Sequence, residues 1–100
     1  DVAGSITTGS SKEPVGVYTV GSGQTITSTG TTFNLGDTSY GFVNVGNGNN
    51  ITSTGGSATL SNNGVYIYSN DKAGSITNST NISSTGTTGK NYGIFFWTSR

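Results

Sequence analysis

Apolar residues are sparse along this chain and return in short bursts between long polar stretches. Four bursts each include a glycine followed by apolar and aromatic residues: "VGVYTV" at 15–20, "YGFVNV" at 40–45, "NGVYIYS" at 63–69 and "YGIFFWT" at 92–98. They are short, rich in β-branched and aromatic residues, and bounded by Gly, Asn and Ser, which predicts four strands. The leading glycines at 16, 41, 64 and 93 give steps of 25, 23 and 29 residues. We expect these glycines to serve corners or close packing.

Two further phrases recur between the bursts. "GSITTG" (4–9), "QTITSTG" (24–30), "NNITSTG" (49–55) and "GSITNS" (74–79) place Ile6, Ile26, Ile51 and Ile76 at steps of 20, 25 and 25. A third segment follows as "TFNLG" (32–36), "SATLSN" (57–62) and "TNISST" (80–85). The first unit lacks this third segment, and "SSKEPV" (10–15) there predicts a loop or an edge feature.

A unit of about 25 residues with three short strands is what one coil of a parallel β-helix requires. The sequence therefore predicts an all-β solenoid of about four coils over residues 1–100, with each coil paired in register to the next. The alternative is an antiparallel meander or sandwich. That fold predicts turns every 8–12 residues or so and a strand partner inside each unit.

Composition supports strands over helices and over disorder. Thr, Ser, Gly and Asn make up 61 of the 100 residues, yet the net charge is zero and ten residues are aromatic. Disordered chains usually carry more charge and fewer aromatic residues. Leu occurs only at 35 and 60 and Met is absent, so strong helix formers are scarce. There is no Cys, so stacking of repeats rather than disulfides has to stabilise the fold.

The few charges are expected in loops. Those away from the two ends are Lys12, Glu13, Asp37, Asp71, Lys72 and Lys90. A charge inside a stacked strand would face like neighbours and burial, so we expect no strand to contain one. Only four scattered bases and zero net charge argue against nucleic acid or an anionic membrane as a partner. No run of about 18 apolar residues predicts insertion of this segment in a membrane.

Stacking turns sequence positions into columns, and three of them are candidate functional or structural features. We expect an inward core ladder of Ile6, Ile26, Ile51 and Ile76. The flanking positions then point outward and form a candidate threonine face of Thr7, Thr27, Thr52, Thr77, Thr29 and Thr54. A candidate contact stripe consists of Tyr18, Val43, Tyr66 and Phe95 with Tyr68 and Trp97.

Alternation alone leaves the orientation of the aromatic strands open. The other side, Val17, Phe42, Val65 and Ile94, is also apolar, and a narrow interior suits Val and Ile better than Tyr and Trp. Either choice leaves an apolar stripe outside. Such a stripe is a docking surface for a protein or for the faces of sugar rings, unless a flanking loop such as 83–91 covers it.

Catalytic and metal-binding signals are missing. The chain has no His, and its only adjacent acid–base pairs are Lys12–Glu13 and Asp71–Lys72, so no base is at hand to activate the many hydroxyls. "GSGQT" and "GNGNN" lack the Lys of a phosphate loop and the Asp of a calcium-binding repeat. We therefore predict a protein that is not an enzyme and binds no cofactor or metal.

The phrases "NITSTG", "NNGVYIYSND" and "STGTTGKNYGIFF" resemble passenger repeats of bacterial autotransporter adhesins of type V secretion, over nearly the whole chain. The resemblance implies a right-handed β-helix stalk, exported through the bacterial outer membrane and displayed at the cell surface or secreted. Its partner would be a protein or glycan on a target cell. Residues 1–100 would then be a segment of a longer passenger.

Two alternatives remain at this stage. A solenoid with open strand edges can stack end to end with further copies of itself into an extracellular fibre. The threonine columns also resemble the flat arrays of ice-binding solenoids. The uneven steps of 20 and 25 residues, together with Gly9 and Ser79 at positions that would continue the array, argue against that lattice.

Overall fold

The computed structural model describes residues 2–9 and 14–97, with the side chain of Trp97 excepted. The described residues form strands, turns and loops without a helix. The strands are β1 (Ser5–Thr7), β2 (Val15–Ser22), β3 (Thr25–Thr29), β4 (Thr32–Asn34), β5 (Tyr40–Asn47), β6 (Asn50–Leu60), β7 (Val65–Asp71), β8 (Ser75–Ser84) and β9 (Tyr92–Trp97). Lys12 and Glu13, predicted in a loop, lie outside the described residues.

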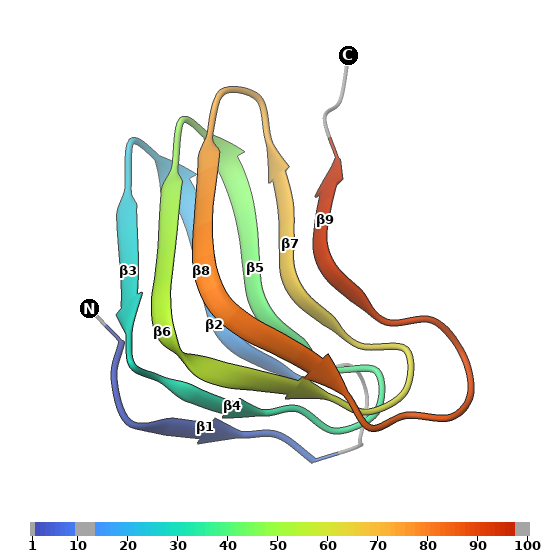
Figure 1. Ribbon diagram of the computed structural model, residues 1–100. Helices are drawn as coiled ribbons and strands as arrows, with labels where there is room; N and C mark the ends of the chain where they lie inside the picture. Colours follow the sequence, from blue (N-terminus) through green and yellow to red (C-terminus); the bar gives the residue numbers. More distant parts are fainter. Residues whose placement is uncertain (1, 10–13, 98–100) are drawn as a thin grey trace.

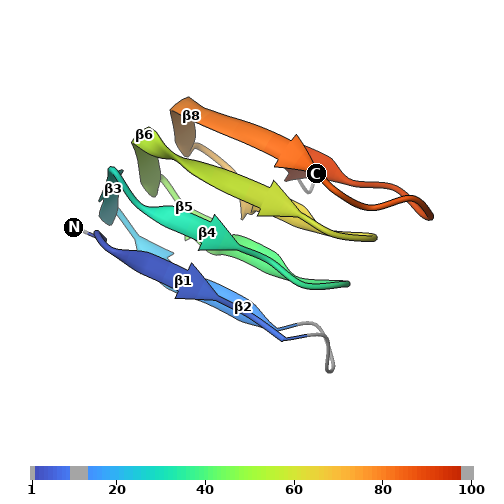
Figure 2. The same cartoon turned by 60° about the horizontal axis from the view of Figure 1, so that its bottom comes forward.

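All named strand pairs are parallel and join successive coils. One sheet has the order β2-β5-β7-β9, and a second contains β1, β4, β6, β3 and β8. The coils stack as layers, with β1, β4, β6 and β8 lying one above the next in Figure 2. This confirms an all-β parallel solenoid of about four turns, and the parallel pairing rules out the antiparallel meander.

Each coil has three sides, as Figure 1 shows, but it does not always have three separate strands. One side is the sheet β2-β5-β7-β9. The second side contains β3 and the first halves of β6 and β8, and the third contains β1, β4 and the second halves of β6 and β8. In the later coils one long strand bends through the corner, with a register shift between Thr54 and Ser57. There, two predicted strands are fused into one.

The isoleucine ladder is present for three of its four members. Ile26, Ile51 and Ile76 stand in register and pack in the core. The prediction for Ile6 is wrong, because Ile6 pairs with Phe33 on the third side. Its column continues through Ala58 and Ile82. The first coil therefore does have the third segment, at β1, because the phrase "GSIT" occurs on two different sides of the solenoid.

The aromatic strands have a definite orientation. Val17, Phe42, Ile67 and Ile94 share one column that faces the interior, whereas Tyr18, Val43, Tyr68 and Phe95 share the neighbouring outward column. The expected alignment of Val65 with Phe42 is wrong by two residues, since Val65 pairs with Tyr40. Ile94 and Phe96 of β9 are 44% and 46% exposed because no described strand covers that side of β9.

Tyr66 is the largest fully buried side chain and fills the middle of the solenoid. Its ring meets Phe33 edge-on at 5.1 Å and Phe42 at 5.6 Å between centroids. Tyr66 lies between the pairs Tyr40–Val65 and Phe42–Ile67, at the level of Gly41. A Cβ on Gly41 would lie 2.6 Å from the Tyr66 carbonyl oxygen and 2.8 Å from its ring, so this glycine is required for close packing.

Asp71 corrects the expectation that no strand contains a charge. It is the last residue of β7 and is 1% exposed. Its carboxylate accepts hydrogen bonds from the backbone N–H groups of Gly48, Asn49 and Ala73 at 2.7–3.0 Å, and from the Asn44 amide at 3.2 Å. Because these donors compensate for the lost hydration, the charge is tolerated at this position.

Candidate functional site

The outer side of the sheet β2-β5-β7-β9 carries a continuous apolar surface, which we call the aromatic face. Three outward columns make it: Val15, Tyr40, Val65 and Tyr92; then Tyr18, Val43, Tyr68 and Phe95; then Val20 and Val45. Tyr18 and Val20 are 65% and 66% exposed, and Tyr92 and Phe95 are also exposed. This surface contains no charged residue among the described positions.

The predicted contact stripe agrees with this face only in part. Tyr18, Val43, Tyr68 and Phe95 lie on it in one register, and Trp97 pairs with Asn70 at its edge, its side chain lying outside the described part. Tyr66 is wrong, because it is buried in the core. Tyr40 and Tyr92 were missed, although both directly precede a glycine in the phrase "YG", which marks their shared column.

A hollow opens in the aromatic face above Val43. In the column of four, Val43 is the one small side chain, with Tyr18 on the preceding coil and Tyr68 on the following one. The hollow has a volume of about 350 Å³ and is lined by Val15, Tyr18, Tyr40, Val43 and Tyr68. The Tyr40 ring stands at 88° to that of Tyr68, with centroids 5.9 Å apart. Tyr68 stacks on Phe95 at 5.4 Å with an interplanar angle of 10°.

The segment 83–91 does not cover the aromatic face. Its backbone instead bonds to the loop of the preceding coil: Thr87 and Thr88 donate to Asn62, and Lys90 donates to Asn63. Asn62 in turn donates to Asp37 one coil earlier. These loops form their own hydrogen-bonded ladder, which leaves the aromatic face accessible to solvent.

The threonine face is more regular than the sequence indicated. Its outward side chains on β3, β6 and β8 stand in three columns of one register: Thr25, Asn50 and Ser75; Thr27, Thr52 and Thr77; Thr29, Thr54 and Ser79. Every step is 25 residues, and the uneven step of 20 came from assigning Ile6 to the wrong side. Thr7 does not belong here, because it lies on β1 beside Asn34.

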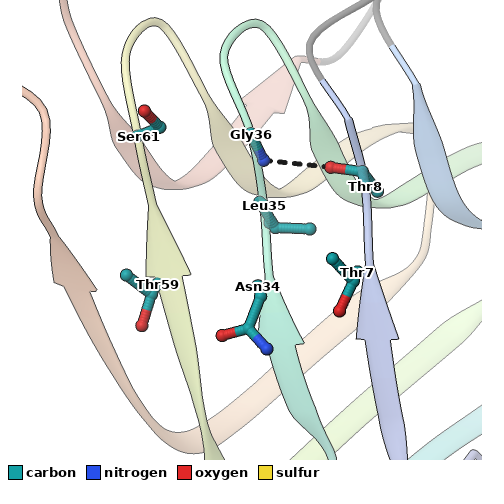
Figure 3. Close-up of a pocket in the computed structure, with 7 residues that line it drawn as sticks. All are labelled: Thr7, Thr8, Asn34, Leu35, Gly36, Thr59 and Ser61. Atoms are coloured by element: carbon teal, nitrogen blue, oxygen red, sulfur yellow. Dashed lines mark hydrogen bonds between the residues drawn. The ribbon is translucent and has the colours of Figure 1, made fainter.

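A shallow polar depression of about 290 Å³ lies on the third side of the solenoid. Figure 3 shows Thr7, Asn34 and Thr59 on three neighbouring strands, with the Gly36 N–H donating to Thr8 Oγ1 at 3.0 Å. Leu35 and Ser61 complete the lining. The depression offers hydroxyl and amide groups but no titratable side chain, so it contains no residue suited to acid–base catalysis.

The buried titratable groups serve the scaffold. Burial raises the pKa of Asp71, but its hydrogen bonds from Gly48, Ala73, Asn49 and Asn44 outweigh this and lower the pKa to about 2. Burial raises the pKa of Tyr66, partly offset by hydrogen bonds with Ser53 and Thr80. Every buried polar side-chain atom in the described ranges has a hydrogen-bond partner. Those ranges also contain no cluster of three residues able to hold a metal ion.

Comparison with known proteins returns no relatives: the chain matches no family model, no curated protein and no solved structure. Within residues 2–9 and 14–97 there is no helix with the length and apolar character needed to cross a membrane.

Proposed function

We propose that this chain is a non-enzymatic adhesive segment of an extracellular or cell-surface β-solenoid, with the aromatic face as its contact surface. The single observation that carries the proposal is that face, with Tyr18 and Val20 about two-thirds exposed on a rigid, uncharged sheet. Soluble proteins rarely leave aromatic side chains grouped in water unless the group contacts a partner. Stacked coils hold those side chains at fixed spacing, which reduces the entropy lost on binding.

The resemblance to autotransporter passenger repeats agrees with this role and suggests a target on another cell. Hydrogen bonding also supports it: Asp71 and Asp37 accept several bonds from loops of neighbouring coils, so their carboxylates stabilise the scaffold. A rigid solenoid with an outward contact surface is suited to holding a binding site away from the surface that displays it.

Adhesion of coated beads tests the proposal. Fluorescent beads carrying the chain are incubated with cultured epithelial cells and counted after washing. We expect binding above that of beads carrying albumin, and loss of most of it in the double variant Tyr18→Ser, Phe95→Ser. The matched control Thr27→Ser, Thr77→Ser changes the threonine face and should bind like the unaltered chain. Equal retention of unaltered and albumin-coated beads would refute the proposal.

The regular threonine face supports a second candidate function, binding to ice. Thr27, Thr52 and Thr77 repeat at one strand spacing of about 4.8 Å, and neighbouring columns lie two residues apart, about 6.6 Å. Such a flat, uncharged grid of hydroxyl and methyl groups can order water on an ice surface. An ice recrystallisation assay tests it: small crystals should persist with the chain and coarsen with Thr52→Tyr. Coarsening with the unaltered chain would exclude this function.

A further inference from the structure

The outward column Tyr18, Val43, Tyr68 and Phe95 is a ladder of aromatic rings with one rung missing. Tyr68 and Phe95, on adjacent coils, stack at 5.4 Å with nearly parallel rings. Tyr18 and Tyr68 are two coils apart, which is about 10 Å at the usual strand spacing. Val43 between them is too short to fill that space, and the hollow described above is the result.

A flat ring placed above Val43 would restore the spacing found between Tyr68 and Phe95. It would lie about 5 Å from the Tyr18 level and the same from the Tyr68 level. Tyr40 closes one side of the space, and Val15 lies beside it. The hollow therefore has the dimensions of one six-membered ring enclosed by aromatic side chains, and it is open to solvent on the outer side.

The size of the aromatic face favours a small ligand over a protein partner. Three strand spacings and five residue rises give a patch of roughly 15 by 17 Å, or about 250 Å². A stable protein–protein interface buries about 800 Å² on each partner, several times more than this patch offers. A short run of sugar rings needs no larger area, because each ring contacts one or two aromatic side chains.

The chemistry of the face points in the same direction. The described residues of the face carry no charge, which disfavours acidic or basic ligands. Hydrogen-bonding groups surround the hollow, with phenol hydroxyls on its tyrosines and the Asn70 amide in register with Val45. An apolar floor with polar groups at the rim matches a pyranose ring, whose C–H face is apolar and whose edge carries hydroxyls.

From this geometry we propose that the hollow above Val43 binds one ring of a neutral glycan, sandwiched between Tyr18 and Tyr68. The inference rests on the proposed adhesive function and names its ligand class. Substituting Val43→Tyr supplies the missing rung from the protein itself and should fill the site. The fold should tolerate this change, since the same column already holds tyrosine at 18 and 68.

The direct test uses defined neutral oligosaccharides: cellotetraose, maltotetraose, chitotetraose and lacto-N-tetraose. Titration followed by NMR should shift the Val43 methyl signals for at least one of them. Affinity for that sugar should fall at least tenfold in Val43→Tyr and in Tyr18→Ser. Val45→Tyr adds the same side chain one column away and should bind within twofold of the unaltered chain. Unshifted Val43 signals with all four sugars, or equal losses in Val43→Tyr and Val45→Tyr, would overturn the inference.

The bead assay separates failure of this inference from failure of adhesion itself. Mild periodate oxidation of the target cells destroys sugar diols and should abolish bead binding, whereas proteolysis should leave binding to glycolipids in place. Beads that still bind after periodate but not after proteolysis would identify a protein target, so the glycan inference would fail while adhesion stands. Beads that never bind would refute the proposed function.

Discussion

Replacing Asp71 by Asn tests whether the turns between coils depend on a buried charge. The carboxylate of Asp71 accepts four hydrogen bonds, three from backbone N–H groups and one from Asn44. An amide keeps one oxygen but places an NH₂ group against donors, so at least two of these bonds are lost. A hydrogen bond to a charged group contributes about 1.5–3 kcal/mol. Allowing for local relaxation, we expect Asp71→Asn to lower the free energy of unfolding by about 2–4 kcal/mol.

The pH dependence gives this prediction a second, independent readout. The folded-state pKa of Asp71 is about 2, below its ordinary value of 3.8, so its stabilising effect is present above pH 3.8 and is lost as the pH falls toward 2. The difference corresponds to about 2 kcal/mol at neutral pH, reduced to about 1–2 kcal/mol by solvent screening at the turn. Asp37 also has a lowered pKa, chiefly from hydrogen bonds with Ser61 and Asn62, and contributes in both proteins. The difference between the two acid profiles therefore isolates Asp71.

Urea unfolding followed by circular dichroism, at pH 7 and at intervals from pH 5 to pH 2, measures both effects. The unaltered chain should lose stability more steeply than Asp71→Asn over this range, so that the two curves converge at low pH. If Asp71→Asn has the unaltered midpoint at pH 7 and the same acid profile, then the carboxylate contributes nothing to the turn. The reasoning from its hydrogen bonds would be wrong.

Three substitutions in the interior test the packing. Ile51→Ala should lower the free energy of unfolding by about 2–5 kcal/mol, because Ile51 is 1% exposed; half-buried Ile76→Ala should lose clearly less, and equal losses would contradict the burial. Gly46→Ala should lower the melting temperature strongly, since the new Cβ would lie 1.9 Å from the Gly21 carbonyl oxygen, whereas Gly9→Ala meets no neighbouring atom and should have no effect. Tyr66→Phe removes the hydroxyl that bonds Ser53 at 2.7 Å and should cost about 1–2 kcal/mol by urea unfolding; an unchanged midpoint would show that this bond is not stabilising.

The period of the sequence was sufficient to predict the class of fold. Ile26, Ile51 and Ile76 recur every 25 residues, and the structure places them in one column. A fixed step identifies partners directly in a parallel solenoid, because every coil repeats the same path. The scarcity of apolar residues is explained in the same way, since each buried side chain packs against its equivalents above and below as well as across the interior.

The errors came from marking units by phrases instead of by the step. "GSIT" occurs at 4–7 and at 74–77, but β1 and β8 place it on different sides of the solenoid. Gly64 resembles Gly16 and Gly41 in its phrase, yet the residue one step of 25 beyond Gly41 is Tyr66. Aligning the glycines moved Tyr66 onto the outer face, whereas the pairs that flank it show that it replaces a glycine.

The candidate site could be predicted only in part. Strand alternation identified the outward column of Tyr18 and Val43, but it could not decide which column faces water. That choice depends on the interior, where Phe33, Phe42 and Tyr66 already fill the space between the three sides. The hollow above Val43 also needed the register, since Val43 is a gap only when Tyr18 and Tyr68 are its neighbours.

The unequal side chains within the inward columns give each coil an identity. A chain built from like repeats can misfold by pairing a coil with the wrong neighbour, because most contacts would survive such a slip. Bulky Phe33 is matched to small Ala58 one coil later, and a slip by one full coil would set it against Ile82 instead. The interior therefore encodes the order of the coils as well as their cohesion, and sequence irregularity is what keeps this repetitive fold unique.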